Sequence, residues 1–170
     1  MRCYKANPKM PNYLMGSLPS ARITQARPFL NVGVDYCGPF FIKEKKERNR
    51  IRVKAYVVVF VCFVTKAIHL ELVTDLTTET CLGAIKRFFA RRGKAKNIYS
   101  DNGTNFVGAK NEILALQAFV SSQKFEKTIQ EFAVEQNIKW HFSPPRSPHF
   151  GGLWEAAVKS FKRHFHKTVG

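Results

Sequence analysis

The chain has 170 residues, 45% of them hydrophobic and 15 of them Phe, so it can bury one substantial core, and we expect a single domain with a short appendage. The chain has 28 Lys and Arg against 12 Asp and Glu. Its net charge of +16 is far from the near-neutral charge of an ordinary small soluble domain. Nucleic acid is the favoured polyanionic partner, because the charge comes with aromatic residues and is not concentrated in one amphipathic helix, as it would be in a membrane-surface protein. The alternative is a protein that is basic only for solubility.

We expect an intracellular protein without a membrane span. The longest apolar run, Ala55 to Val64, is β-branched and about ten residues long, which suits a buried strand better than a bilayer helix. The amino end, Met1 to Lys5, lacks the hydrophobic segment of a signal peptide. The four cysteines show no Cys-x-x-Cys pair and no His at zinc spacing, so we predict no disulfide and no complete zinc site; they are Cys3, Cys37, Cys62 and Cys81.

The amino-terminal residues 1–28 have the composition of a linker, with four Pro, scattered Gly and Ser, and no hydrophobic period. The pattern changes at Phe29, where an apolar, β-prone run begins and continues to Ile42. This run contains Asp35 and is broken by Gly38-Pro39. We therefore predict that Asp35 lies inside a strand.

The next two apolar runs complete an antiparallel meander. A charged loop over 43–50 leads into the run from Val53 to Val64, and a turn then leads into the run from Ile68 to Val73. In the last run the side chains alternate, with Ile68, Leu70 and Leu72 on one face and His69 and Glu71 on the other. This alternation predicts a half-buried strand, whose polar face, with His69, needs no function.

The second half of the chain alternates helices with strands. Thr77 can cap a helix that ends at Arg91, Arg92 and Gly93. The further elements expected are a strand over 97–100, helices over about 105–120 and 124–136, a strand over 138–142, a loop rich in Pro and Gly over 143–152, and a final helix from Leu153. Trp140, in the strand over 138–142, and Trp154, in the final helix, are expected in core positions. This order predicts an α/β fold with a mixed five-stranded sheet, in which three antiparallel strands precede β-α-β units, flanked by helices.

Three acidic residues stand where such a fold could bring them together. Asp35 lies on the first strand, Asp101 follows the fourth, and Glu155 lies in the opening turn of the last helix. Close carboxylates raise one another's pKa unless a cation lies between them. Two Mg2+ ions about 3.5–4 Å apart could activate an attacking oxygen and stabilise a leaving oxygen in a displacement at phosphorus. The alternative for Asp101 is a helix cap.

A cationic stripe follows Glu155 along its helix. Lys159, Lys162 and Arg163 come at i+4, i+7 and i+8, and such a stripe could follow a phosphate backbone away from the acids. Taken alone, the pattern favours a solvated ion pair between Glu155 and Lys159, worth a few tenths of a kcal/mol.

Three motifs carry a resemblance to a known family. They are Gly33-Val-Asp-Tyr-Cys-Gly-Pro39, Tyr99-Ser-Asp-Asn-Gly-Thr-Asn-Phe106 and Pro148-His-Phe-Gly-Gly-Leu-Trp-Glu155. In this order they resemble the signatures of the retroviral and retrotransposon integrase catalytic core, and the last is most similar to integrases of BEL/Pao-type LTR retrotransposons. The resemblance spans about Leu18 to Gly170. It implies a ribonuclease H-like fold and DNA integration through 3′-end processing and strand transfer.

The resemblance also implies roles for single residues. Asp35 would bridge two Mg2+ or Mn2+ ions, and Asp101 and Glu155 would each bind one. Lys159 and Lys162 match family positions that hold element-end DNA, and Thr104 matches a small residue beside the target strand. The implied partners are DNA and further copies of the chain, as a homodimer or higher oligomer, and the implied place of action is the nucleus.

The chain departs from the retroviral pattern in two places. Between Asp101 and Glu155 lie 53 residues, more than retroviral enzymes have, and the predicted helix over 124–136 accounts for the excess. In the loop before Glu155, Arg146 and His149 replace uncharged polar residues, so we include Arg146 among the candidate DNA contacts.

The resemblance divides the chain into two parts. Residues 1–28 would be a linker with a remnant of an amino-terminal zinc-binding domain, and residues 29–170 the catalytic core. Cys3 resembles the last ligand of that domain, and its three partners are absent, so we expect no zinc and a core fragment. The alternatives to an integrase are a transposase or nuclease of the same fold, or a catalytically silent DNA-binding or oligomerisation module of a decayed or domesticated element.

Overall fold

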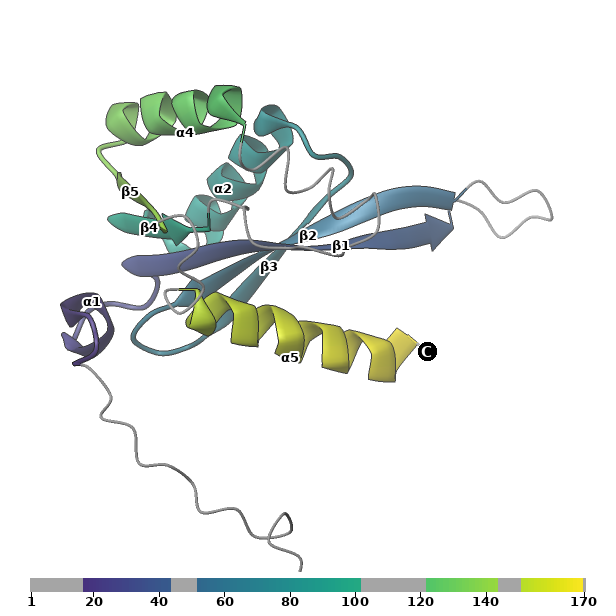
Figure 1. Ribbon diagram of the computed structural model, residues 1–170, viewed down its shortest axis with the longest axis horizontal. Helices are drawn as coiled ribbons and strands as arrows, with labels where there is room; N and C mark the ends of the chain where they lie inside the picture. The colour runs from purple at the N-terminus through teal and green to yellow at the C-terminus, as the bar shows by residue number, and fades with distance from the viewer. Residues whose placement is uncertain (1–16, 44–51, 102–121, 144–150, 170) are drawn as a thin grey trace, which may run out of the picture.

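A computed structural model describes residues 17–43, 52–101, 122–143 and 151–169 (Figure 1). The elements are α1 (Ser20–Ile23), β1 (Asn31–Lys43), β2 (Arg52–Cys62), β3 (Ile68–Val73), α2 (Thr78–Arg92), β4 (Asn97–Ser100), α4 (Gln123–Glu135), β5 (Lys139–Phe142) and α5 (Gly152–Val169). The short helix α1 lies in the segment predicted as linker. The sequence pattern did not indicate it, because four residues are too few to show a hydrophobic period. The predicted helix over 105–120 lies outside the described residues.

The strands form one mixed sheet in the order β3-β2-β1-β4-β5. Strand β2 pairs antiparallel with both β1 and β3, whereas β4 pairs parallel with both β1 and β5. The predicted meander and the five-stranded mixed sheet flanked by helices are therefore confirmed. The first and fourth strands are neighbours near the middle of the sheet.

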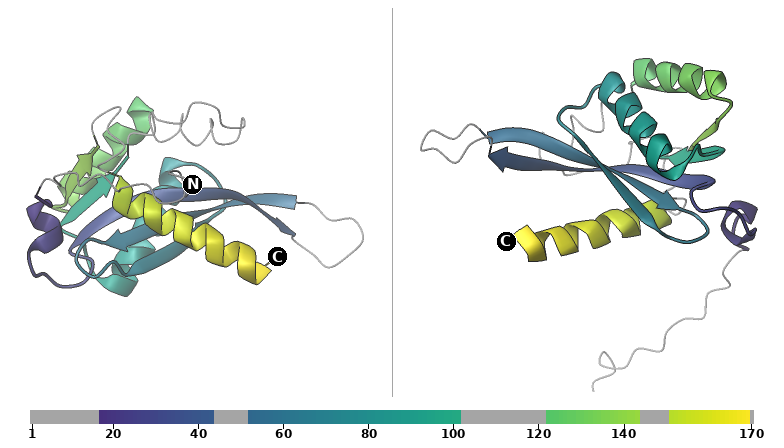
Figure 2. Two further views of the ribbon diagram at one scale, coloured as in Figure 1. Left: turned by 60° about the horizontal axis from the view of Figure 1, so that its bottom comes forward. Right: turned by 180° about the vertical axis from the view of Figure 1, so that it is seen from behind.

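Helices cover both faces of the sheet (Figures 1 and 2). Helix α5 packs on β1 and β2 from one side, and α2 and α4 pack from the other side against β3 and β5. Strand β2 serves both layers, because Val58 and Phe60 belong to the core under α2 whereas Val59 and Val61 belong to the core under α5. Burying each such side chain contributes about 1.5–3 kcal/mol, so the central strands are held from both faces.

Helix α2 begins and ends where the sequence predicts. The Thr77 hydroxyl accepts a hydrogen bond from the Thr80 N–H at 3.2 Å, which caps the helix start. At the other end Gly93 has a φ of 82°, and its N–H donates to the Phe89 carbonyl at 2.9 Å. Helix α4 likewise begins after Ser122, whose side chain accepts from the Phe125 N–H.

Strand β1 continues through Gly38-Pro39, where the sequence predicts a break. The pairing with β2 shifts register between Cys37 and Phe40 and then resumes as far as Lys43 and Arg52. The Gly38 backbone has a φ of 148°, and a Cβ there would lie 2.8 Å from Tyr56 Cδ1. The Gly-Pro step therefore makes a bulge, which interrupts the ladder without ending the strand.

Strand β3 alternates as predicted, but its polar face is the buried one. His69 and Glu71 are 8% and 4% exposed, whereas Leu70 and Leu72 are 41% and 54% exposed. Glu71 accepts hydrogen bonds from His69 at 2.8 Å and from the α2 side chains Arg87 at 2.7 Å and Arg91 at 2.6 Å. The arginines of α2 therefore cover the polar face of β3. His69 lies on that polar face, as predicted, and is buried there.

The described cysteines are buried, as expected. Cys37, Cys62 and Cys81 are free thiols. Burial raises the pKa of the Cys37 thiol to about 11, so it is protonated at neutral pH and behaves as a small hydrophobe. In the part of the chain that the structure describes, no helix has the length and hydropathy to cross a bilayer.

Candidate active site

Two of the predicted acids lie at corresponding positions along the neighbouring parallel strands β1 and β4. The last paired residues of β1 and β4 are Val34 and Ser100, and Asp35 and Asp101 come next along each segment. Asp35 is also paired with Val59 of β2, whose side chain lies in the core under α5. Because directly paired residues share a face, Asp35 lies on the face of the sheet that α5 covers.

Helix α5 comes close to β1 through Trp154. A Cβ on Gly33 would lie only 2.4 Å from Trp154 Cε3, so the indole ring occupies space that any other residue at position 33 would fill. Trp154 is 2% exposed, as predicted for a core residue, and stacks on Phe63, which in turn stacks on Tyr99 of β4. This packing holds the first turn of α5, with Glu155, over the sheet near Asp35.

A second glycine lies against the Glu155 carboxylate. A Cβ on Gly151 would lie 2.7 Å from Glu155 Oε1 and 3.1 Å from Trp154 Nε1. This short distance to Oε1 shows that the carboxylate lies back over the start of its own helix. The Glu155 N–H also donates to the Gly151 carbonyl at 3.0 Å. Neither Gly33 nor Gly151 was predicted as a site residue, although a Gly inside a strand, such as Gly33, is a sign of close packing.

Burial of Asp35 dominates the electrostatics of the site. It raises the pKa of Asp35 to about 7, against the opposing effect of the Tyr36 N–H, which donates to Asp35 Oδ1 at 2.7 Å. The negative charges of Asp101 and Glu155 raise this pKa further, and the positive charge of Lys162 lowers it. The three predicted acids and one predicted DNA-binding lysine therefore lie within electrostatic range of one another.

The chemistry of these side chains suits a hard divalent cation. Carboxylate oxygens are the ligands that Mg2+ prefers, and a cation would relieve the repulsion that Asp35 experiences from Asp101 and Glu155. Across the described ranges, however, no three His, Cys, Asp or Glu side chains converge closely enough to hold a metal ion. The acids are therefore gathered around Asp35 without forming a closed ligand set.

The predicted DNA contacts divide into two groups. Lys159, Lys162 and Arg163 are exposed on α5, and Lys162 is near enough to Asp35 and Cys37 to lower the pKa of both. The other predicted contacts, Thr104 and Arg146, lie outside the described residues, as does His149. Trp140 is half-buried at the edge of the core, where its Nε1 donates to Ser100 Oγ at 3.0 Å.

Two solved structures of a retroviral integrase core share this fold. The HTLV-2 integrase catalytic core domain, solved in complex with magnesium, matches 83% of this chain and 72% of its own length, with a TM-score of 0.51 and 20% identity in its trimeric form. The dimeric form has the same coverage, with a TM-score of 0.52 and 21% identity. These likenesses establish the fold, which is that of an integrase catalytic core and is ribonuclease H-like.

A larger assembly shows the same fold. A chain of the simian T-cell lymphotropic virus intasome, solved in complex with the PP2A regulatory subunit B56 gamma, matches 99% of this chain with a TM-score of 0.56 and 16% identity. This chain spans 51% of the length of that one.

The sequence itself matches the integrase core domain over residues 28–148, and the chain therefore belongs to this family. The matched range contains Asp35 and Asp101, and Glu155 lies just beyond it. No curated protein matches the sequence.

Proposed function

We propose that this protein is the catalytic core of a retroelement integrase, which joins the ends of element DNA to target DNA by polynucleotidyl transfer. The observation that supports this most is the electrostatic coupling of Asp35 to Asp101 and Glu155 on an integrase-core fold. The net charge of +16 is consistent with an enzyme that acts on DNA, because each contact between a cationic side chain and a phosphate adds salt-sensitive affinity. The motif around Glu155 favours a BEL/Pao-type element, and integration into target DNA implies action in the nucleus.

In this proposal the three acids would hold two divalent cations. Asp35 would be shared between the ions, and Asp101 and Glu155 would each hold one. Mg2+ or Mn2+, when bound, supplies Lewis-acid activation of the attacking and leaving oxygens at phosphorus. The chain itself contributes preorganisation, because the Tyr36 N–H holds Asp35 Oδ1 and Trp154 packs at the Gly33 position to fix the turn that carries Glu155.

The reaction has two displacements at phosphorus. A water oxygen first attacks the phosphorus of a phosphodiester near the 3′ end of the element DNA. The P–O bond to the element's 3′ oxygen breaks, so the element keeps a 3′-hydroxyl and the terminal nucleotides leave with the phosphate at their 5′ end. The new 3′-hydroxyl then attacks a phosphodiester of the target, where a P–O bond to the target's own 3′ oxygen breaks. Lys159, Lys162 and Arg163 would hold the element backbone, Thr104 would lie beside the target strand and Arg146 would contact DNA, in a homodimer or higher oligomer.

Incubation with branched DNA that resembles an integration product tests this function. With Mg2+ or Mn2+, the wild type should resolve the branch into a continuous target strand and a released element end. Asp101→Asn should be slower by roughly 100-fold or more, because it removes one charged oxygen ligand. The matched control is Asp75→Asn on the exposed residue Asp75, which should retain wild-type activity. Equal resolution by wild type and Asp101→Asn would overturn the assigned site.

A catalytically silent DNA-binding module is the second candidate. It is favoured by the absence, among the described residues, of three acids close enough to hold a metal ion. Titration calorimetry with Mn2+ separates the two functions. An enzyme should bind Mn2+ through Asp35 and lose this binding in Asp35→Asn, whereas a silent module should bind DNA without binding Mn2+ in either form.

A further inference from the structure

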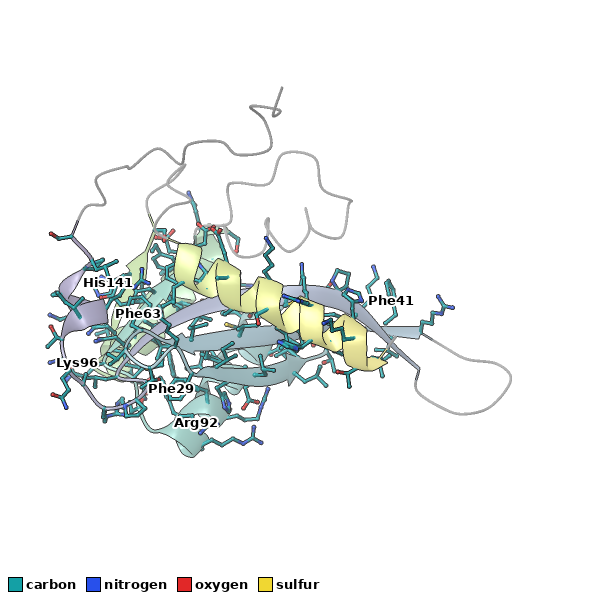
Figure 3. All side chains as sticks on the ribbon, turned by 90° about the horizontal axis from the view of Figure 1, so that it is seen from below. Phe29, Phe41, Phe63, Arg92, Lys96 and His141 are labelled. Atoms are coloured by element: carbon teal, nitrogen blue, oxygen red, sulfur yellow. The ribbon has the colours of Figure 1, made fainter. Side chains whose placement is uncertain are left out.

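The hairpin formed by β1 and β2 extends beyond the helices that cover the rest of the sheet (Figures 1 and 2). After the bulge the two strands pair from Phe40 and Ala55 to Lys43 and Arg52. We call residues 40–43 and 52–55 the arm. Phe41 lies on it near the carboxyl end of α5, at the opposite end of the molecule from Phe29 and Phe63 (Figure 3).

The base of the arm is fixed to α5. The ring of Phe40 lies 5.9 Å from that of Phe161 and 4.6 Å from that of Phe165, both on α5, and Ala55 opposite Phe40 is 1% exposed. These aromatic contacts hold the direction of the arm relative to the helix that carries Glu155.

The two faces of the arm differ in chemistry. Phe41 is directly opposite Lys54, and Arg52 lies two residues before Lys54 on the same strand, so these three side chains share one face. All three are exposed, and Phe41 is 53% exposed. The other face carries Ile42 and Val53. One face of the arm therefore presents an aromatic ring next to two cationic side chains.

The sequence of the arm indicates an anionic partner. Its eight residues include Lys43, Arg52 and Lys54 and no Asp or Glu, a net charge of +3 within a chain of +16. Interfaces between proteins are depleted of Lys, whereas surfaces that bind nucleic acid combine cations with exposed aromatic rings. A two-stranded ribbon also has dimensions that a major groove of about 12 Å admits.

We propose that the arm is a DNA-contacting element separate from the candidate active site. Arg52 and Lys54 contact phosphates of duplex DNA, and Phe41 packs against a sugar or base edge. Phe41 lies six positions after Asp35 along β1, or roughly 20 Å away at 3.3 Å per residue, which corresponds to about six base pairs. The choice of DNA as the polyanion rests on the proposed function, but DNA binding by the arm does not require catalysis.

Salt-dependent binding tests the cationic contacts. The full chain is titrated onto a fluorescent duplex of about 30 base pairs at several NaCl concentrations, as wild type and as Arg52→Ala with Lys54→Ala. The double variant should bind roughly 10-fold more weakly, and the slope of log K against log salt should fall by about 1.8, because each phosphate contact contributes about 0.9. Lys124→Ala with Lys127→Ala removes two exposed charges from α4 and should leave the slope unchanged.

Crosslinking tests the position of Phe41. The photoreactive residue p-benzoylphenylalanine is placed at position 41 or, as the control, at Val134, which is 79% exposed on α4. Irradiation with duplex DNA should give a protein–DNA adduct from position 41 and none from position 134. Crosslinks from position 41 to a second protein chain, with DNA affinity unchanged in the Arg52 and Lys54 double variant, would overturn the proposal and assign the arm to a protein interface.

DNA binding by the arm and catalysis at the candidate active site can be tested independently. If the wild type resolves branched DNA but the arm variants bind DNA as the wild type does, the arm proposal fails and the integrase proposal stands. If no form resolves the branch but the arm variants lose affinity and salt slope, the arm proposal stands without catalysis.

Discussion

At the scale of single residues, Asp35 is a carboxylate whose burial opposes folding. The pKa of Asp35 is about 7 in the folded chain, whereas it is 3.8 for an ordinary Asp. Above pH 7 the carboxylate is charged in both states, but the charge is less favourable in the folded state, where it is buried. Stability should therefore fall as the pH rises from about 4 to 7 and then level off. Asp35→Asn keeps an acceptor for the Tyr36 N–H and should be more stable than the wild type at pH 8, by up to about 4 kcal/mol.

Urea unfolding in EDTA at pH 4, 6 and 8 measures this effect. The stability difference between Asp35→Asn and the wild type should grow with pH. Asp75→Asn is a control of opposite sign, because hydrogen bonds from the Thr80 and Thr77 hydroxyls lower the pKa of Asp75. The advantage that Asp75 gives the wild type should be present at neutral pH and lost as the pH falls through its folded pKa. Parallel pH profiles for Asp35→Asn and the wild type would contradict the burial argument.

At the scale of elements, the docking of α5 on β1 depends on Gly33. In Gly33→Ala the new methyl group would lie 2.4 Å from Trp154 Cε3, so the indole ring and the first turn of α5 must move. We expect a loss of about 1–3 kcal/mol of stability from overpacking. Activity on branched DNA should fall by about 100-fold, because Glu155 shifts with the turn. Urea midpoints and rates of branch resolution check the two effects.

The matched control for this substitution is Gly83→Ala. Gly83 lies in α2, and a Cβ there would have Arg87 Nη1 as its nearest neighbour at 3.5 Å, an ordinary contact. This variant should be as stable as the wild type or slightly more stable, since Ala is favoured over Gly inside a helix. If Gly33→Ala behaves like Gly83→Ala, Gly33 does not position Glu155.

Local sequence signals were sufficient to predict the bounds of α2 but not the buried face of β3. Caps and periodicity located α2 well, because Thr77 and Gly93 act through local geometry. The alternation of β3 was also correct, but the buried face depended on which helix covers it. That helix carries Arg87 and Arg91, which hydrogen-bond Glu71, and a pattern within six residues of β3 contains no information about them.

At the scale of the whole molecule, the mixed five-stranded sheet flanked by helices could be predicted from the order of elements. The close approach of Trp154 to Gly33 could not, because it depends on how two elements far apart in the chain fit together. The pKa of Asp35 depends on the same packing, since burial is its largest cause. The sequence therefore predicts which acids could meet, but only the packed molecule shows how strongly they interact.

Divalent cations should stabilise the whole fold if they bind at Asp35. At Mg2+ concentrations of about ten times the dissociation constant, linkage gives roughly 1.4 kcal/mol and an increase in Tm of about 2–6 °C. Asp35→Asn should lose this increase, and so should the wild type at pH 5.5, because Asp35, with a pKa of about 7, must lose its proton to bind metal. Calorimetric scans need NaCl controls of equal ionic strength, since a chain of net charge +16 gains stability from screening by any salt. An equal increase in Asp35→Asn would mean that the cation acts elsewhere on the molecule.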